Sequence, residues 1–210
     1  MRFVLVLALS LASLALVHSR GTEGQVPPAP DAAAARMVPT NASGPIRFDD
    51  VAEEAGLDFR LENHPTPDKR LPETMPGGVA TLDYDGDGLT DIYFTNGAEM
   101  PSREKSSPTY WNRLYRNEGG LRFRDVTEAA GVAGAGYSMG VAAADYDNDG
   151  DVDLFVAGLD RNILYRNTGK GAFEDVTARA GIASRGWAVA AGWFDYDNNG
   201  LLDLFVVNYL

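Results

Sequence analysis

Short apolar segments separated by polar turns dominate this chain, and residues 140–176 show the pattern most clearly. "GVAAADY" leads into an acidic loop, and "DLFVAG" leaves it. Small residues before the loop and a continuous apolar run after it are typical of strands that are covered on both faces. "ILYRN" follows, and "AFEDV" comes after a Gly-containing turn. The pattern predicts a unit of four short strands, at residues 140–146, 153–158, 163–167 and 172–176.

The same unit recurs along the chain. The segment "LYRNEGGLRFRDVTEAAGV" from Leu114 is similar to "LYRNTGKGAFEDVTARAGI" from Leu164. Its second half is also similar to an earlier segment, "IRFDDVAEEAGL" from Ile46. The acidic loops follow the same rhythm, because "DYDNDGDVD" at Asp145 and "DYDNNGLLD" at Asp195 are also 50 residues apart. Tandem four-stranded units of about 50 residues are typical of a β-propeller. The fold class that we predict is therefore all-β, built of antiparallel propeller blades.

The units differ in length and completeness. The first unit carries two additional polar, Pro-containing segments, around "HPTPDKRLPETMP" and "GAEMPSREKSSPT", which we expect to be surface loops. The third unit stops after its second strand, in "DLFVVNYL". We therefore expect an incomplete propeller, with that last strand left as an unpaired edge. Thr127 and Thr177 each precede a short segment that ends in Gly, which predicts a single helical turn with a Thr N-cap.

The N-terminal region has a different composition. Arg2, an apolar run over residues 3–17 and a small residue at position 19 are typical of a secretory signal peptide over residues 1–19, with an uncleaved anchor as the alternative. Residues 20–44 are rich in Pro, Ala and Gly, and we expect a disordered linker there. The propeller repeats then occupy residues 45–210. We expect a secreted or periplasmic protein with no stable membrane insertion after cleavage.

Charge narrows the classes of partner. The chain has 30 Asp and Glu against 18 Lys and Arg, a formal net charge of −12, and no Cys. Such an acidic surface disfavours nucleic acid and favours cations or basic partners. An exported chain without disulfides needs another form of stabilisation, and bound metal is the obvious substitute.

The acidic loops have the ligand pattern of a calcium site. Carboxylates stand at positions 1, 3 and 9, Asp or Asn at position 5, and Gly at position 6, where a sharp turn is needed; position 7 offers its backbone carbonyl. Many hard oxygen ligands without His or Cys select Ca²⁺, and Mg²⁺ prefers more water. Up to three Ca²⁺ sites are predicted. Their ligands are Asp83, Asp85, Asp87, Leu89 and Asp91; Asp145, Asp147, Asp149, Asp151 and Asp153; and Asp195, Asp197, Asn199, Leu201 and Asp203.

Within these sets, Leu89, Asp151 and Leu201 contribute carbonyl oxygens, and we expect the Asp151 side chain to face solvent. The third loop has one carboxylate fewer and should bind more weakly. A helix-flanked calcium loop needs Glu at position 12, but Phe94, Val156 and Val206 stand there inside strand patterns. The remaining alternative is a set of Asx-rich turns without metal.

The acidic loops and the segments that follow them resemble known repeats. "DYDNDGDVDLFV" resembles the FG-GAP/VCBS repeats of integrin-α-like propellers, and "LYRNTGKGAFEDVTARAGI" is similar to ASPIC/UnbV-type proteins related to cartilage acidic protein. The resemblance covers about residues 46–210. It implies a calcium-stabilised propeller, commonly seven-bladed, with the metal loop between the first two strands of each blade. Members usually carry more blades and a C-terminal module, so we expect this chain to be an N-terminal fragment.

The residues for catalysis are few. After removal of residues 1–19 the only His is His64, in the first additional segment, and there is no Cys and no phosphate-binding loop. We expect no enzyme activity. Trp111 is the preferred surface aromatic for a protein or glycan ligand, Trp187, Tyr110 and Tyr137 are further candidates, and Trp193 is expected in the core. The predicted function is calcium-stabilised adhesion or recognition; the alternative is a non-catalytic propeller within a larger exported enzyme.

Overall fold

The computed structural model describes residues 3–6, 48–182 and 186–209, and these residues form three antiparallel β-sheets. Helical structure in the described residues is confined to α1 (Thr127–Ala130) and two 3-10 helices, η2 (Leu71–Thr74) and η3 (Pro108–Tyr110). The predicted all-β class is confirmed. The predicted signal peptide and the predicted linker lie outside the described residues, apart from residues 3–6.

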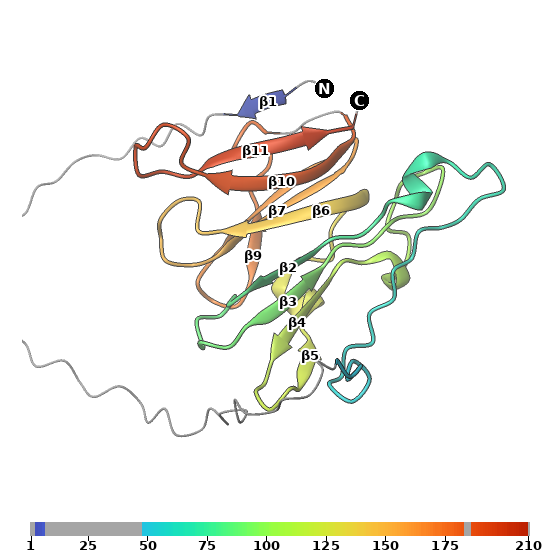
Figure 1. Ribbon diagram of the computed structural model, residues 1–210, viewed down its shortest axis with the longest axis horizontal. Coiled ribbons are helices and arrows are strands. Elements are labelled where there is room, and N and C mark those ends of the chain that lie inside the picture. The colour runs from blue at the N-terminus through green and yellow to red at the C-terminus, as the bar shows by residue number, and fades with distance from the viewer. Residues whose placement is uncertain (1–2, 7–47, 183–185, 210) are drawn as a thin grey trace, which may run out of the picture. The chain divides into compact units, whose positions relative to one another are not determined.

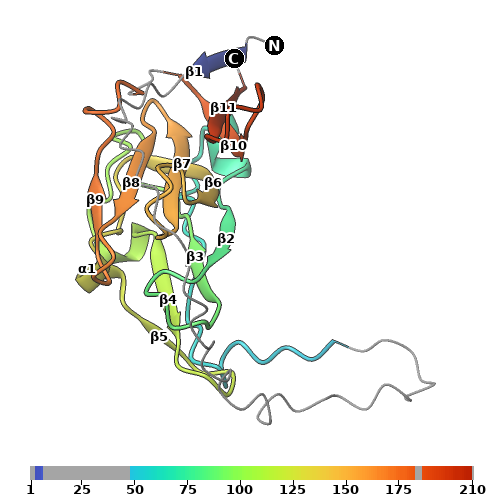
Figure 2. The same cartoon turned by 90° about the vertical axis from the view of Figure 1, so that its left-hand side faces the viewer.

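Two of the sheets are complete four-stranded units in simple up-and-down order (Figures 1 and 2). Each strand is hydrogen-bonded to the next in the chain, as expected for the predicted unit. The boundaries follow the sequence pattern, although the first strand of the second sheet begins three residues earlier than predicted. The first sheet contains β2 (Val79–Leu82), β3 (Asp91–Phe94), β4 (Arg113–Asn117) and β5 (Phe123–Asp125), and the second contains β6 (Tyr137–Ala144), β7 (Asp153–Leu159), β8 (Ile163–Asn167) and β9 (Phe173–Asp175).

The third sheet differs from the prediction at its edge. It contains β10 (Ala188–Phe194) and β11 (Asp203–Asn208), as the repeat predicts. We expected the outer edge of β11 to be unpaired, but β1 (Phe3–Val6) pairs with it antiparallel, from Phe3 opposite Val207 to Val6 opposite Leu204. The pairing gives the exposed backbone donors and acceptors of β11 partners, which is the physical reason that open edges attract strands.

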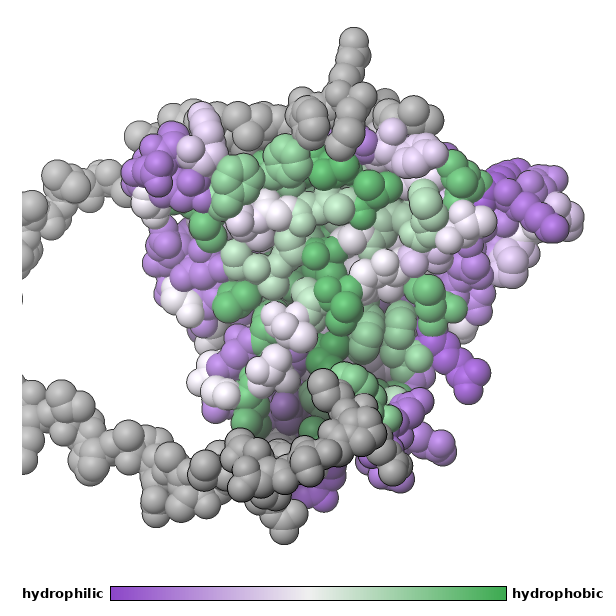
Figure 3. Space-filling model, in the orientation of Figure 1, coloured by the Kyte–Doolittle hydropathy of each residue, from purple (hydrophilic) through white to green (hydrophobic). Residues whose placement is uncertain are grey.

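The first strands of the three sheets lie next to one another, β2 against β6 and β6 against β10 (Figure 1). Close approach depends on glycine. A Cβ added to Gly78 would lie 2.8 Å from Met139 O, and one added to Gly140 would lie 2.7 Å from Val189 O. Apolar residues gather on the face where these strands lie (Figure 3).

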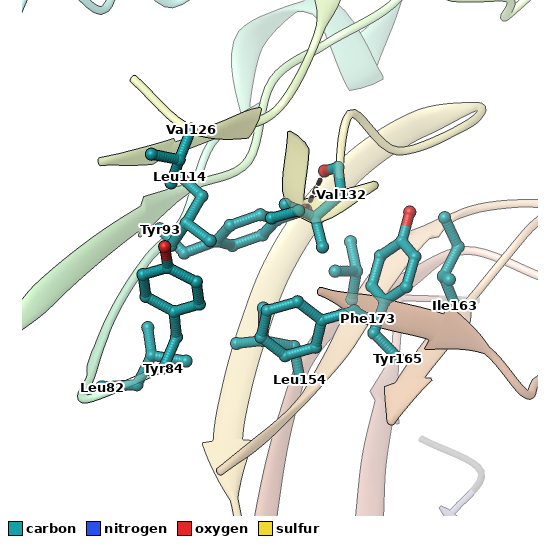
Figure 4. Packing of buried hydrophobic residues seen from close by; sticks show 12 residues of the cluster. Leu82, Tyr84, Tyr93, Leu114, Val126, Val132, Leu154, Ile163, Tyr165 and Phe173 are labelled. Carbon is teal, nitrogen blue, oxygen red and sulfur yellow. Dashed lines mark hydrogen bonds between the residues drawn. The ribbon is translucent and has the colours of Figure 1, made fainter. Parts of the chain in front are cut away.

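The hydrophobic core lies between adjacent sheets. One cluster joins the first two sheets and includes Tyr93 and Leu114 from one and Leu154 and Tyr165 from the other (Figure 4). The buried Tyr93 hydroxyl donates to the carbonyl of Val132 at 2.9 Å, so its polar end is satisfied. A second cluster joins the second sheet to the third through residues that include Phe155, Val176, Leu204 and Val206. The second sheet therefore buries both faces, one against each neighbouring sheet, as a propeller blade does.

The predicted Thr N-caps are wrong. Thr127 is the first residue of α1, and Val126 holds the N-cap position without a side-chain cap. The Thr127 hydroxyl instead accepts a hydrogen bond from Leu114 N at 2.9 Å, and Thr177 accepts one from Leu164 N at 2.8 Å. A buried strand N–H needs a partner more than an exposed helix end does. The predicted Gly stop of the first turn is confirmed, because Gly131 is left-handed with φ 74°.

The first additional segment of the first unit is anchored by a buried carboxylate. Glu73 in η2 accepts hydrogen bonds from both Thr66 N (2.8 Å) and Thr66 Oγ1 (2.6 Å). The Asn63 side chain donates to the Glu73 carbonyl at 2.6 Å, and the Tyr137 hydroxyl donates to the Asn63 carbonyl at 3.0 Å. The segment is thus an ordered loop attached to the second sheet.

Candidate metal centres

The three acidic loops occupy equivalent places in the three sheets. Each connects the first strand of a sheet to the second, β2 to β3, β6 to β7 and β10 to β11. Each brings three aspartates together, and one carboxylate oxygen from each lies within 4.8 Å of the other two. The three groups are Asp83, Asp85 and Asp91; Asp145, Asp147 and Asp153; and Asp195, Asp197 and Asp203.

The side chain of the position 1 aspartate accepts hydrogen bonds from backbone N–H groups further along each loop. Asp83 accepts hydrogen bonds from the N–H groups of Gly86, Asp87 and Gly88 at 2.8 to 3.1 Å. Asp145 and Asp195 accept the corresponding bonds from the residues four and five positions further on. These contacts curl the loop around the carboxylate. They also lower the pKa of Asp195, with the bond from Gly200 N as the largest cause.

The position 9 aspartate ties the loop to the sheet. Asp153, fully buried at the start of β7, accepts Tyr146 N at 3.1 Å through Oδ2 and Asn167 N at 2.7 Å through Oδ1. Asp91 repeats both contacts with Tyr84 and Asn117. One carboxylate therefore links the beginning of the loop, the start of the second strand and the end of the third.

The position 5 residues lie outside the three close groups and have another role. Asp87 Oδ1 accepts Leu89 N at 2.9 Å, Asp149 Oδ1 accepts Asp151 N at 3.0 Å, and Asn199 Oδ1 accepts Leu201 N at 2.8 Å. Each is an Asx turn that presents the residue at position 7. The Asx turn uses only one oxygen of each position 5 side chain. That these side chains bind the metal, and that the carbonyls of Leu89, Asp151 and Leu201 do so, stays a prediction.

Asp151, like Asp149, lies outside the close group of the second loop. We expected its side chain to face solvent, but the residue is only partly exposed. A Cβ added to Gly169 would approach Asp151 Oδ2 to 2.5 Å, so the carboxylate lies against the turn between β8 and β9. The absence of a side chain at Gly169 leaves room for the Asp151 carboxylate beside the backbone of that turn.

The electrostatics of the close groups favour a bound cation. Burial raises the pKa of Asp153 to about 7, and the backbone bonds from Asn167 and Tyr146 only partly oppose that effect. Burial also raises the pKa of Asp91, and the pKa of Asp147 is raised by burial and then by Asp149. Burial therefore makes these carboxylates costly to ionise unless a compensating charge is present.

The donor set fits a hard divalent cation. Within the described part of the chain the three groups consist of carboxylates alone, which suits Ca²⁺ and not the softer transition metals. Asp85 Oδ1 is buried and accepts no hydrogen bond, so it has a free lone pair for a ligand. A cation held there would satisfy that oxygen and offset the repulsion among the aspartates.

Sequence reasoning missed the residues around the loops that belong to the third strand. Asn117 and Asn167 each donate their backbone N–H to the position 9 aspartate, and Asn167 Nδ2 also donates to Tyr84 O at 2.8 Å. Arg116 forms ion pairs with Asp85 and Asp87. The recurring "LYRN" was the available signal, because its Arg and Asn are polar residues repeated in register beside an acidic loop.

The structure also places the residues considered for catalysis or ligand binding. His64 Nδ1 lies 2.6 Å from the Tyr110 hydroxyl, so its observed partner is a tyrosine. Tyr137 is buried, which removes it as a surface aromatic. Trp193 is half-buried and stacks on Tyr146 with ring centroids 5.7 Å apart.

Trp111 and Trp187 are both half-buried. Arg113 lies over the Trp111 ring at 5.7 Å from its centroid, and Trp187 packs on Tyr209 at 4.7 Å between centroids. Neither tryptophan is fully exposed, because each has a side chain beside its ring.

Up-and-down four-stranded sheets that pack face to face, each with an acidic loop after its first strand, define a propeller-type repeat protein. Comparison with protein families matches an FG-GAP-like repeat at residues 83–156 and again at 145–206, together more than half of the chain. The chain belongs to the FG-GAP-like repeat family, whose repeats are propeller blades with a structural or recognition role and not a catalytic one. No curated protein matches the chain. Within the described residues, no helix has the length and apolar character needed to cross a bilayer.

Proposed function

We propose that this protein is an exported, calcium-stabilised β-propeller that acts in adhesion or in recognition of a protein or glycan. Calcium has a structural role in this proposal: it holds the loop between the first two strands of each blade. The blades then present their connecting loops as a rigid surface. The predicted division into a signal peptide (1–19), a linker (20–44) and propeller repeats (45–210) is part of the same proposal.

The observation that carries the metal assignment is the threefold recurrence of one carboxylate group. Three aspartates at positions 1, 3 and 9 converge in every loop, with oxygens within 4.8 Å. A metal-free Asx turn explains the backbone bonds of positions 1 and 5, but it does not require a buried carboxylate at position 9 with a raised pKa. A cation accounts for both features.

Export and affinity are consistent with each other. Extracellular calcium modules bind at about 10⁻⁴ to 10⁻³ M, so sites of this kind are occupied outside the cell. The FG-GAP-like repeat is typical of extracellular proteins. The resemblance of "LYRNTGKGAFEDVTARAGI" to ASPIC/UnbV-type and cartilage acidic protein-like sequences, and of the loops to VCBS repeats, supports the same assignment.

Recognition is supported by a surface feature of the first sheet. Trp111, Arg113, Arg124 and Glu128 line a pocket of about 590 Å³, and an aromatic ring beside charged groups suits a polar ligand such as a glycan or peptide. The alternative is that the repeats form the non-catalytic part of a larger exported enzyme. A glycan and protein array probed with the wild type and with Trp111→Ala separates a binder from a scaffold: binding that depends on Trp111 supports recognition, and an empty array contradicts it.

Calcium-dependent stability is the direct test of the metal assignment. We expect the melting temperature in 5 mM CaCl₂ to exceed that in EDTA, with a smaller effect of MgCl₂. Circular dichroism or differential scanning fluorimetry measures the shift. Equal melting temperatures in calcium and EDTA would overturn the assignment.

A further inference from the structure

Arg116 binds the first loop as a cation would. Its Nε lies 2.6 Å from Asp85 Oδ2, and its Nη2 donates to Asp87 Oδ2 at 2.9 Å. Both carboxylates belong to the predicted ligand set of that loop. The attraction of Asp85 is the largest contribution that raises the pKa of Arg116.

The equivalent arginine of the second unit has a different partner. Arg166 stands in β8 where Arg116 stands in β4, but its ion pair is with Glu174, at 3.5 Å. No ion pair joins a base to an acid of the second or third loop in the described part of the chain. Among the described residues, the first loop is thus the one whose carboxylates form ion pairs with an arginine, whereas Arg166 acts on Asp147 of the second loop only through its charge, which lowers the pKa of that carboxyl against the larger effect of burial.

The cross-strand neighbour explains the difference. Arg116 is directly opposite Arg124 in the pairing of β4 with β5, whereas Arg166 is directly opposite Glu174 in the pairing of β8 with β9. Like charges in opposite positions repel, and unlike charges attract. Arg124 is itself paired with Glu118 at 2.6 Å. The charge at this one position therefore directs the arginine to the loop in the first unit and to the outer strand in the second.

We propose that Arg116 is an internal counter-ion of the first loop that competes with calcium, and that the residue opposite it on the outer strand, Arg124 or Glu174, sets the calcium affinity of each loop. The inference rests on the proposed calcium binding. The second loop, with four predicted carboxylate ligands and no ion pair to an arginine, binds calcium more tightly than the first. The first loop is weaker although it has the same number of carboxylates, because an ion must displace or share the arginine.

Reciprocal charge exchange tests the proposal. Arg124→Glu should draw Arg116 from the first loop to the outer strand and raise its calcium affinity by about tenfold. Glu174→Arg should send Arg166 to the second loop and lower that loop's affinity by a similar factor. Arg116→Gln removes the counter-ion directly and should also raise the affinity of the first loop, while the metal-free protein melts at a lower temperature.

The controls separate a local effect from general charge. Arg122→Glu changes the net charge as much as Arg124→Glu does, on an exposed residue two positions earlier in the chain, and should change calcium affinity less than threefold. Isothermal titration with CaCl₂ is performed on the full chain. The titration is repeated in a double variant, Asp147→Asn with Asp197→Asn, which weakens the second and third loops and so isolates the first. Circular dichroism first establishes that the double variant is folded. If it is not folded, the intact-chain isotherms of the two exchanged variants decide.

The outcomes are distinguishable. Opposite shifts for Arg124→Glu and Glu174→Arg, with a small shift for Arg122→Glu, support the inference. If the wild type binds calcium but Arg124→Glu and Arg116→Gln bind it no better than the control, the counter-ion inference fails and the proposed function stands. If no variant binds calcium, both fail.

Discussion

At the scale of single residues, the polar side chains that recur in each repeat accept hydrogen bonds from backbone N–H groups of neighbouring strands and loops. Thr127 and Thr177 each accept the N–H of a residue in the third strand of their sheet, Leu114 or Leu164. Asp153 accepts one N–H from its own loop, at Tyr146, and one from the end of the third strand, at Asn167. Buried N–H groups are costly without partners, so these side chains are fixed by the fold as much as by any ligand.

Asp147 and Asp151 of the second loop allow a matched comparison. Asp147 belongs to the close group and Asp151 does not. We expect Asp147→Asn to remove about 1–2 kcal/mol of calcium-dependent stabilisation at millimolar calcium, because one site is weakened. Asp151→Asn should leave that stabilisation nearly unchanged. Urea unfolding with calcium and with EDTA measures the difference, and equal losses in the two variants would refute the ligand assignment.

At the scale of elements, the first additional segment is an ordered loop because its polar groups have specific partners. Asn96 Oδ1 accepts Glu62 N at 2.7 Å, and the Asn96 side-chain amide donates to the carbonyls of Arg60 and Trp111. A Cβ at Gly97 would lie 2.3 Å from Glu62 O, so the segment lies directly on the backbone of the sheet end. Glu73 completes this anchoring with its bonds from Thr66.

The anchoring by Glu73 predicts a pH dependence. Its hydrogen bonds with Thr66 lower its pKa below the ordinary 4.5. The folded state therefore binds fewer protons than the unfolded state, and the contribution to stability is complete above about pH 4.5 and is lost as pH falls through the lower folded pKa. Glu73→Gln should flatten the fall in unfolding free energy below pH 4.5. Exposed Glu53→Gln is the control and should retain the wild-type profile; the same flattening in both would contradict this role.

At the scale of the whole molecule, the sheets are held by large apolar side chains between their faces and by glycine where their first strands meet. Tyr93, Leu114, Leu154 and Phe155 are fully buried between sheets. Gly140 in β6 lies against β10 so closely that a Cβ would meet Ala190 Cα at 3.0 Å. Blade packing therefore depends on a residue that the apolar pattern alone does not mark.

This contact predicts unequal effects of two similar substitutions. Gly140→Ala should destabilise the protein by about 1–3 kcal/mol, because backbone atoms of the neighbouring strand must move. Gly192→Ala, in β10, has no atom within 4 Å of the added Cβ and should be neutral or slightly stabilising. Neither glycine has a positive φ, so backbone conformation does not confound the comparison. Chemical denaturation in saturating calcium measures both; equal effects would show that the strands can separate without cost.

The sequence by itself determined the repeat, the four-strand pattern, the place of the acidic loops and the class of fold. Periodic spacing and local hydrogen-bonding chemistry are properties of the chain, and spacing alone predicts Asp145, Asp147 and Asp153 as ligands of one loop, together with Asp149 and Asp151; the structure brings the first three together. Only the tertiary structure decided the hydrogen-bond partners of Thr127 and Thr177 and the burial of Tyr137. It also decided the different ion-pair partners of Arg116 and Arg166. Those outcomes depend on which residues stand opposite across strands and between sheets, and a charge such as Arg124 or Glu174 acts on a loop that is distant from it in sequence.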